Sequence, residues 1–381
     1  MHVRLRPQRA SGTKPLAFVL HSLLGLKLSL FVLFVSFTGT IAVVSDEIEW
    51  LASPKFRASA TDRRVSWSTQ YEAARAAFPT YQITGIIAGE EPYLATRIPA
   101  TTPAGEWRVI YIDPATGKVN GESGFITFRS FMRGLHYYLF TPGDWGFYIV
   151  TSLGFLLLGS VITGLLVYKK FWRGFFRLPR TNRGSRVFWG TLHKLLALWS
   201  VWFVLIIALT SVWYFGERIL YRFDIDVETH HAAIADHELE RLRLQSPHHR
   251  PLDELVMRAQ EALPELNVTS IDLPFAPSEP VYIKGQASAW LVRDRTNSVA
   301  VNPFTGAVLS VRRAQSMSVL ERWAHTADPL HFGDFAGLWS KLIWLLLGLI
   351  MCGLAASGAV VYAKRTSKAL SKFKANIFNA S

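Results

Sequence analysis

The chain has 381 residues, of which 50% are hydrophobic and 18% charged, and its mean hydropathy is +0.20. So few charges in so apolar a chain exclude an ordinary soluble globular protein and indicate a membrane protein in contact with lipid. The formal net charge of +13 does not indicate nucleic-acid binding, because the excess of Lys and Arg lies beside the apolar runs.

Four apolar runs approach or exceed the roughly 20 residues that a helix needs to cross the hydrocarbon core. They predict the following segments: cytoplasmic tail 1–15, first span 16–45, first external domain 46–146, second span 147–168, cytoplasmic link 169–187, third span 188–215, second external domain 216–337, fourth span 338–363 and cytoplasmic tail 364–381. At about 28 residues, the first run is too long for the apolar core of a signal peptide, so we expect an uncleaved anchor.

The charges predict the orientation of these spans. All 28 Asp and Glu residues lie within 46–144 or 217–334, whereas the two tails and the link contain none and hold 16 of the 41 Lys and Arg residues. By the positive-inside rule, both termini and the link are cytoplasmic, and the two large segments face the periplasm of a bacterium. We therefore expect a multi-pass protein of the inner (cytoplasmic) membrane.

The second half of the chain repeats the first. Three pairs of matching stretches carry the repeat: 21–26 with 193–198, 113–117 with 302–306, and 167–168 with 361–362. The second pair reads Asx-Pro-x-Thr-Gly, which predicts a hairpin turn, because Pro presets φ and Gly adopts positive φ. Both halves start in the cytoplasm, so the repeats are parallel.

The repeat predicts a membrane all-α four-helix bundle with two small α+β periplasmic domains. Amphipathic patterns predict helices at 68–78 and 252–263, and apolar β-branched stretches predict strands at 108–112 and 289–301. Because one axis would relate both halves, we expect the two external segments to form one composite module rather than two independent domains.

Four histidines occupy related places in the two halves. His21 and His193 lie near the cytoplasmic ends of the first and third spans, and His136 and His331 lie just before the second and fourth spans. A histidine at membrane depth is by default a functional hypothesis. Two pairs at two depths predict two b-type haems with an imidazole on each face of the iron. For any single histidine the alternative is an interfacial hydrogen-bonding residue.

The outer site has a second candidate ligand. His325 is an alternate because its distance in sequence from His136 equals the distance between the two predicted turns. His331 fits better by its Leu-His context and its distance from the following span. Pro142 and Gly143 interrupt the chain after His136, so we expect that histidine on a short interfacial segment rather than on a continuous helix.

Basic residues near the histidines are candidate partners for haem propionates. Arg133 and Arg322 lie near the outer pair. Lys27 and Lys194 lie near the inner pair, where snorkelling to the membrane interface is the alternative.

These stretches resemble the PepSY-associated transmembrane family over essentially the whole chain. The resemblance rests on the stretch 21–26 that begins with His21, on Thr38-Gly39, on the two Pro-x-Thr-Gly turns, and on residues 329–333 ahead of the apolar run 342–349. Within that family the chain most resembles siderophore-iron reductases of the FoxB type. The resemblance implies PepSY-like domains at 46–146 and 216–337, two b-type haems, and reduction of ferric siderophore in the periplasm for iron release.

The expected reaction carries an electron from the cytoplasmic-side haem to the periplasmic-side haem and on to Fe(III). Reduction to Fe(II) releases the iron, because hard oxygen ligands hold Fe(II) less well. The sequence lacks the Gly-x-Gly-x-x-Gly turn of a nicotinamide or flavin domain, so the donor is expected to be a quinol or a cytoplasmic reductase. The alternatives are a haem-free PepSY-type periplasmic binding or regulatory membrane protein and a siderophore transport subunit.

Overall fold

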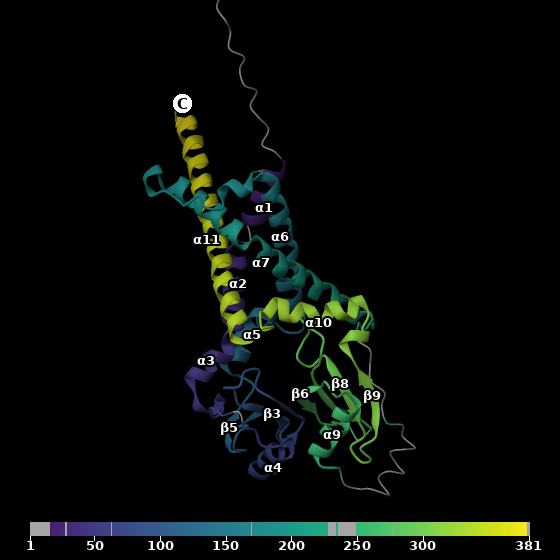
Figure 1. The fold of residues 1–381 in the computed structure, drawn as a ribbon. Coiled ribbons are helices and arrows are strands. Elements are labelled where there is room, and N and C mark those ends of the chain that lie inside the picture. The colour runs from purple at the N-terminus through teal and green to yellow at the C-terminus, as the bar shows by residue number, and fades with distance from the viewer. Residues whose placement is uncertain are drawn as a thin grey trace, which may run out of the picture. The chain divides into compact units, whose positions relative to one another are not determined.

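The computed structural model describes residues 16–26, 29–61, 63–168, 170–227, 234, 249–276 and 278–378. Contacts between residues divide the chain into two units, whose elements are labelled in Figure 1. The helical unit comprises Met1–Phe37, Tyr148–Val212 and Leu346–Ser381, and the sheet unit comprises Thr38–Phe147 and Trp213–Leu345.

Three helices among the described residues are long and apolar enough to cross a membrane. They are α6 (Trp145–Val167), α7 (Ser185–Arg222) and the Gly337–Ser367 part of α11 (Gly337–Phe378). They coincide with the second, third and fourth predicted apolar runs, and α7 and α11 continue as helix beyond those runs. The chain is therefore a membrane protein with several apolar helices.

The first apolar run is helical in the parts that the structure describes. α1 covers Leu16–Leu26 and α2 covers Ser29–Val43, while Lys27 and Leu28 lie outside the described residues. α2 is followed by α3 (Ser45–Ala52) at an angle of 58°, and the two make a fourth span only if they are taken together. A bundle of four spans built from two repeats stays a prediction.

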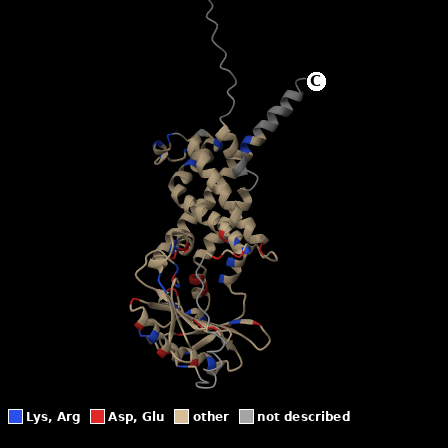
Figure 2. Cartoon of the chain, turned by 90° about the vertical axis from the view of Figure 1, so that its right-hand side faces the viewer, with Lys and Arg blue, Asp and Glu red and all other residues tan. Residues whose placement is uncertain are grey.

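Small residues let helices of the helical unit approach closely. A β-carbon on Gly154 of α6 would lie 2.8 Å from the side chain of Ser211 in α7, and one on Gly353 of α11 would lie 3.3 Å from Leu196 in α7. Close backbone approach of this kind is how helices pack in lipid. The sequence of this unit contains no Asp or Glu, and the acidic residues drawn red in Figure 2 belong to the sheet unit.

The described residues of the sheet unit form one antiparallel sheet of nine strands. The strands are β1 (Gln82–Ile83), β2 (Gly85–Ile87), β3 (Thr96–Thr101), β4 (Trp107–Ile112), β5 (Val119–Ser123), β6 (Asn267–Asp272), β7 (Val281–Gln286), β8 (Asn297–Val301) and β9 (Val308–Arg312). Their order is β5-β4-β3-β2-β6-β7-β8-β9, with β1 paired to β3.

The pairing of β2 with β6 joins the two external segments. Ile86 of β2 pairs with Ile271 of β6, and the neighbouring residues pair in the same antiparallel register. The two segments therefore form one composite domain with a single sheet, which confirms the expected composite module.

Two helices pack on one face of this sheet, α4 (Trp67–Ala77) and α9 (Leu252–Ala262), as Figure 1 shows. Both helices were predicted from their amphipathic patterns. Fully buried isoleucines from both halves, including Ile98 and Ile283, form the core beneath them. The two helices are joined where the backbone N–H groups of Ser68 and Asp253 each donate to the other residue's side chain, at 3.2 and 3.1 Å.

Both Asx-Pro-x-Thr-Gly stretches form the predicted turns. The side-chain Oδ1 atoms of Asp113 and Asn302 accept hydrogen bonds from the backbone N–H two residues later, at 3.1 and 2.9 Å. Gly117 and Gly306 have φ values of +73° and +74°, which L side chains rarely adopt.

The predicted strand 289–301 is wrong in its first part. β8 begins only at Asn297, because Leu291 has a φ of +57° and the backbone N–H of Thr296 bonds the carbonyl of Arg293 in a turn. Residues 287–296 thus form the loop between β7 and β8.

Two short helices precede the second and fourth predicted spans. α5 (Phe128–Tyr138) ends where Leu139 and Phe140 adopt φ values of +51°, and α10 (Val319–Phe332) ends at Gly333, with φ +72°. The break after α5 confirms the expectation that no continuous helix runs from His136 into the second span. Within the described ranges, the remaining helical elements are short 3₁₀ turns: η1 (Pro54–Phe56), η2 (Phe171–Gly174), η3 (Thr181–Arg183) and η4 (Ala314–Ser316).

Candidate functional site

The helical unit brings together the first predicted pair of histidines. The ring centres of His21 in α1 and His193 in α7 lie 6.4 Å apart, with 63° between the ring planes. A metal–nitrogen bond is about 2 Å long, and the bonding nitrogen lies about 1.2 Å from the centre of its imidazole ring. Two imidazoles on opposite sides of one metal ion therefore have ring centres about 6 Å apart. The separation of this inner pair fits a metal ion between the rings.

The Nδ1 atom of each inner histidine already has a partner on a neighbouring helix. Nδ1 of His21 lies 3.1 Å from Oγ1 of Thr163 in α6. Nδ1 of His193 lies 3.2 Å from both the carbonyl oxygen of Leu354 and Oγ of Ser357 in α11. Metal-binding histidines usually donate their second ring nitrogen in this way, which fixes the tautomer and the ring rotation. With Nδ1 held in this way, Nε2 of each ring is the nitrogen that could bind a ligand.

A glycine follows each of these hydroxyl residues and makes room for the ring. A β-carbon on Gly164 would lie 3.4 Å from Cε1 of His21, and one on Gly358 would lie 3.3 Å from Cε1 of His193. Both hydroxyl–glycine pairs begin four residues before the Val-Tyr sequence near the end of their span. The two halves of the chain therefore place the same kind of hydroxyl–glycine pair beside an inner histidine, on α6 and on α11.

The second predicted pair lies in the sheet unit. The ring centres of His136 in α5 and His331 in α10 are 6.3 Å apart, with 40° between their planes. The ring of His136 lies against α2, where a β-carbon on Gly39 would be 2.6 Å from its Cε1. Oγ1 of Thr38 lies 3.4 Å from its Nδ1. This outer pair has the same ring separation as the inner pair.

His331 is enclosed from another side by a tyrosine. The ring of Tyr214 in α7 lies 5.3 Å from that of His331, edge to face at 69°. Burial lowers the pKa of His331 to about 3, and the neighbouring His136 adds to this effect. The ring is therefore neutral at physiological pH, which is the form that binds metal ions.

The alternate ligand His325 lies in a different environment. Its side chain is 3% exposed, and its Nε2 lies 3.1 Å from a guanidinium nitrogen of Arg312. The same guanidinium pairs with Glu321 at 2.7 Å. The structure thus pairs His136 with His331 and holds His325 in a polar network of β9 and α10.

The predicted propionate partners differ in their surroundings. The guanidinium of Arg133 lies over the rings of Tyr137 and Phe332, at 5.7 and 5.3 Å, and these rings adjoin the two outer histidines in sequence. Arg322 instead donates to the carbonyl oxygens of Trp290 and Ala314. At the inner pair, Nζ of Lys194 lies 5.3 Å over the ring of Tyr168, and Lys27 lies outside the described residues.

Ion pairs tie the helices around the outer pair to the sheet. Nζ of Lys341 in α11 lies 3.2 Å from Glu47 of α3 and 3.4 Å from Glu90 of the β2–β3 loop. Nε of Arg129 in α5 lies 3.0 Å from Asp46 of α3. Because Lys341 is only 3% exposed, its charge depends on these carboxylates for compensation.

The cations of this network keep Glu90 ionised. Burial alone would raise the pKa of Glu90, but the nearby charges of Arg97, Arg129 and Lys341 hold it well below its ordinary value. The β2–β3 loop is therefore fixed to both α5 and α11 by charge at neutral pH.

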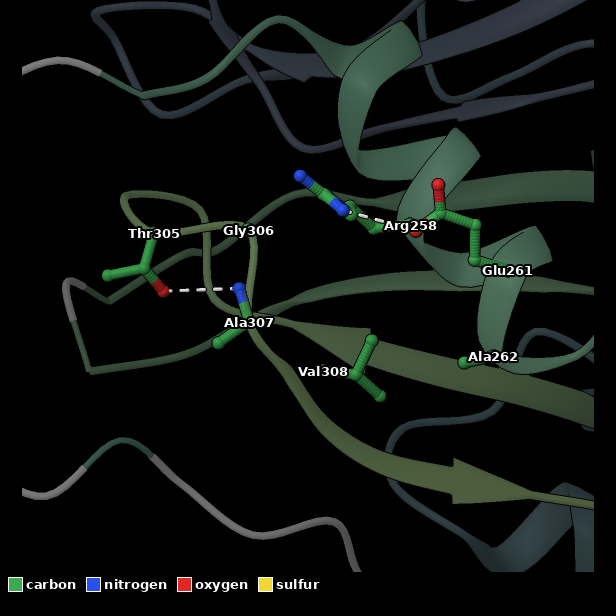
Figure 3. Close-up of a pocket in the computed structure, with 7 residues that line it drawn as sticks. All are labelled: Arg258, Glu261, Ala262, Thr305, Gly306, Ala307 and Val308. Atoms are coloured by element: carbon green, nitrogen blue, oxygen red, sulfur yellow. Dashed lines mark hydrogen bonds and ion pairs between the residues drawn. The ribbon is translucent and has the colours of Figure 1, made fainter.

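A surface hollow of about 520 Å³ lies elsewhere in the sheet unit, between α9 and the turn after β8 (Figure 3). Its polar groups pair with one another: Arg258 with Glu261 at 3.2 Å, and Oγ1 of Thr305 with the backbone N–H of Ala307 at 3.1 Å. Among the described residues, no group of three or more His, Cys, Asp or Glu side chains could hold a metal ion.

A family model described as the PepSY-associated TM region matches residues 18–365. The chain belongs to this family. A comparison with curated proteins found no match. The match includes both histidine pairs and the composite sheet.

Sequence reasoning on this PepSY-associated chain missed the groups that hold the rings. Thr163 and Ser357 were detectable, because the alignment of Val167 with Val361 also places these two hydroxyl residues opposite each other. Tyr214 gives no such signal, because the first half has Ala42 at the matching position.

Proposed function

We propose that this chain is a dihaem electron-transfer protein of the FoxB type, which reduces ferric siderophore to release iron on the periplasmic side of the bacterial inner membrane. The observation that supports this proposal is the presence of two histidine pairs with ring centres 6.4 and 6.3 Å apart. When bound, b-type haem would supply an iron that gains and loses one electron at a time.

The residues around each pair suit a haem. His21 and His193 would hold the cytoplasmic-side iron, with Thr163 and Ser357 orienting their rings through Nδ1. The glycines beside the rings leave the space that a large flat ligand between helices needs.

At the periplasmic-side site, His136 and His331 would hold the iron. Arg133 is the proposed partner of a propionate, because a guanidinium binds carboxylates in two-pronged geometry and stacks on aromatic rings. Arg322 is a weaker candidate for that role, since its guanidinium already donates to two backbone carbonyls.

The proposed substrate is an Fe(III) chelate that docks at the composite sheet domain. The chelated iron gains one electron and becomes Fe(II), and the oxygen ligands of the siderophore then release it. A quinol or a cytoplasmic reductase would supply the electron and become oxidised. The excess of Lys and Arg in the tails and the link supports a periplasmic position for the sheet domain.

An absorption spectrum of the purified chain tests this proposal directly. We expect two haems per chain, a sharp α-band after reduction, and loss of that band when a ferric siderophore is added to the reduced protein without oxygen. A chain without haem would favour the haem-free binding or regulatory protein. A reduced haem protein that ferric siderophore does not oxidise would leave electron transfer but overturn the substrate.

A further inference from the structure

Tyr214 lies between His331 and a carboxylate that belongs to the same helix as that histidine. Its ring contacts the His331 ring edge to face, at 5.3 Å between centres. Its hydroxyl donates a hydrogen bond of 2.8 Å to Oδ1 of Asp328. Asp328 precedes His331 by three residues in α10, so the two side chains lie on one face of the helix. Tyr214 is therefore held at both its ring edge and its hydroxyl.

The carboxylate that holds Tyr214 is itself fixed by the sheet domain. Oδ2 of Asp328 lies 2.6 Å from Nε of Arg293 in the β7–β8 loop, and a second guanidinium nitrogen of Arg293 donates to Oδ1 at 3.2 Å. The backbone N–H of Arg293 also donates to the carbonyl oxygen of His325 in α10, at 3.0 Å. A two-pronged ion pair of this kind restricts both partners more than a single contact does.

In the part of the chain that the structure describes, the contacts of the other outer histidine, His136, are of a different kind. His136 rests on Gly39, where no side chain is present, and the residue that matches Tyr214 in the first half of the chain is Ala42. The two outer rings are thus held by different means although their helices are related by the repeat.

We propose that Tyr214 is a positioning residue for His331, and that Asp328 and Arg293 fix it in place. This inference rests on the proposed function, because the ring that Tyr214 orients is a proposed haem ligand. An edge-to-face contact restricts the rotation of the imidazole. The groups around an axial ligand set its orientation and, through it, the reduction potential of the iron. The β7–β8 loop thereby contributes to the potential of the periplasmic-side haem.

The test uses the purified full-length chain with its haems and two readouts, low-spin EPR and a redox titration. The EPR signal of a bis-imidazole haem changes with the angle between the two imidazole planes. We expect Tyr214→Ala to change the EPR signal of one haem and its equilibrium constant for reduction by at least threefold, about 28 mV for a one-electron couple. The signal and potential of the other haem should not change.

Two conservative variants separate positioning from general damage. Tyr214→Phe keeps the ring but loses the bond to Asp328, so its effect on the EPR signal should be smaller than that of Tyr214→Ala. Asp328→Asn removes a negative charge near the proposed haem together with the ion pair to Arg293, so reduction of the same haem should become easier. Arg295→Gln, an exposed change in the same loop, is the matched control and should behave as the wild type.

The outcomes distinguish this inference from the proposed function. A wild-type chain without haem would overturn both. Two haems whose EPR signals and potentials are the same in wild type, Tyr214→Ala and Asp328→Asn would overturn the positioning role alone. Equal changes at both haems, or equal changes in Arg295→Gln, would also overturn it, because they would indicate a general structural effect.

Discussion

The hydroxyl of Ser357 lies 3.2 Å from Nδ1 of His193 and restricts the rotation of that ring from the neighbouring helix. The equivalent contact in the other half joins Thr163 to His21 at 3.1 Å. In both contacts a short side chain on a membrane helix supplies a partner for a ring nitrogen in an apolar environment.

Removing these hydroxyls should weaken haem binding at the inner site. We expect Thr163→Val to lower the affinity of this site by up to about tenfold, because its ring would lose the contact that selects the ligating tautomer. Ser357→Ala should have a smaller effect, since Nδ1 of His193 also contacts the Leu354 carbonyl. Titration of haem into the apo-protein measures both. Ser152→Ala is the control, because the hydroxyl of Ser152 donates to a carbonyl of its own helix. Affinities equal to that of the control would contradict the role of the two hydroxyls in holding the rings.

A methyl group at Gly39 should disrupt the outer site. The new β-carbon of Gly39→Ala would lie 2.6 Å from Cε1 of His136, too close for the ring to keep its position. We expect this variant to lose one of two haems and to keep the other, as measured by the ratio of haem to protein.

The other helix glycines give a graded comparison. Gly164→Ala and Gly358→Ala would bring a β-carbon to 3.4 and 3.3 Å from an inner histidine, so small shifts should accommodate them with both haems bound. Gly190→Ala meets nothing within 4 Å and should stabilise its helix, since Gly is less favourable than Ala in a helix by about 1 kcal/mol. If Gly39→Ala retained both haems, the ring of His136 could not depend on that close approach.

The sequence predicted the elements whose cause is local. The two turns at Asp113 and Asn302 depend on Pro, Gly and a side-chain acceptor within five residues, and both form. The helices α4 and α9 depend on amphipathic spacing, and both form within one residue of the expected bounds. The histidine pairs were predictable because the repeat relates their positions along the chain, and the structure brings the members of each pair together.

Features that depend on distant contacts were not predictable in the same way. The register of β2 against β6 is set by packing between segments far apart in sequence, so composition gives no signal for it. His325 has the spacing of a ligand, but Arg312 and Glu321 hold its side chain, and no local pattern in the sequence reports that network. The loop at 287–296 resembled a strand because its apolar residues do not reveal the positive φ of Leu291.

The two candidate outer ligands should respond differently to substitution. His331→Ala should remove the outer haem and abolish reduction of ferric siderophore, because its ring is the one that faces His136. His325→Ala should keep two haems per chain and lower the thermal stability, since it leaves Arg312 without one of its contacts. Haem content and unfolding temperature measure these effects. The opposite pattern, with the haem lost only from His325→Ala, would show that His325 is the ligand.

Because of Glu90, the stability of the sheet domain should decrease at low pH. Its folded-state pKa lies well below the unfolded value of about 4.3, because Arg97, Arg129 and Lys341 outweigh the effect of burial. The contribution of Glu90 to stability is therefore complete above about pH 4.3 and is lost as the pH falls through the folded-state pKa. At pH 7 we expect Glu90→Gln to lower the free energy of unfolding by about 1 kcal/mol, because Lys341 and two arginines lose a shared partner whose side chain is 30% exposed and therefore screened by solvent.

The measurement is thermal or denaturant unfolding of wild type and Glu90→Gln in detergent between pH 3 and 7. The difference between the two proteins should be largest at neutral pH and should shrink as the pH falls, because protonation removes the same charge from the wild type that the substitution removes from the variant. Glu106→Gln is the matched control: Glu106 pairs with Arg108, but its side chain is 59% exposed, so its effect should be small at every pH. A difference for Glu90→Gln that stays constant from pH 7 to pH 3 would mean that its charge does not stabilise the fold.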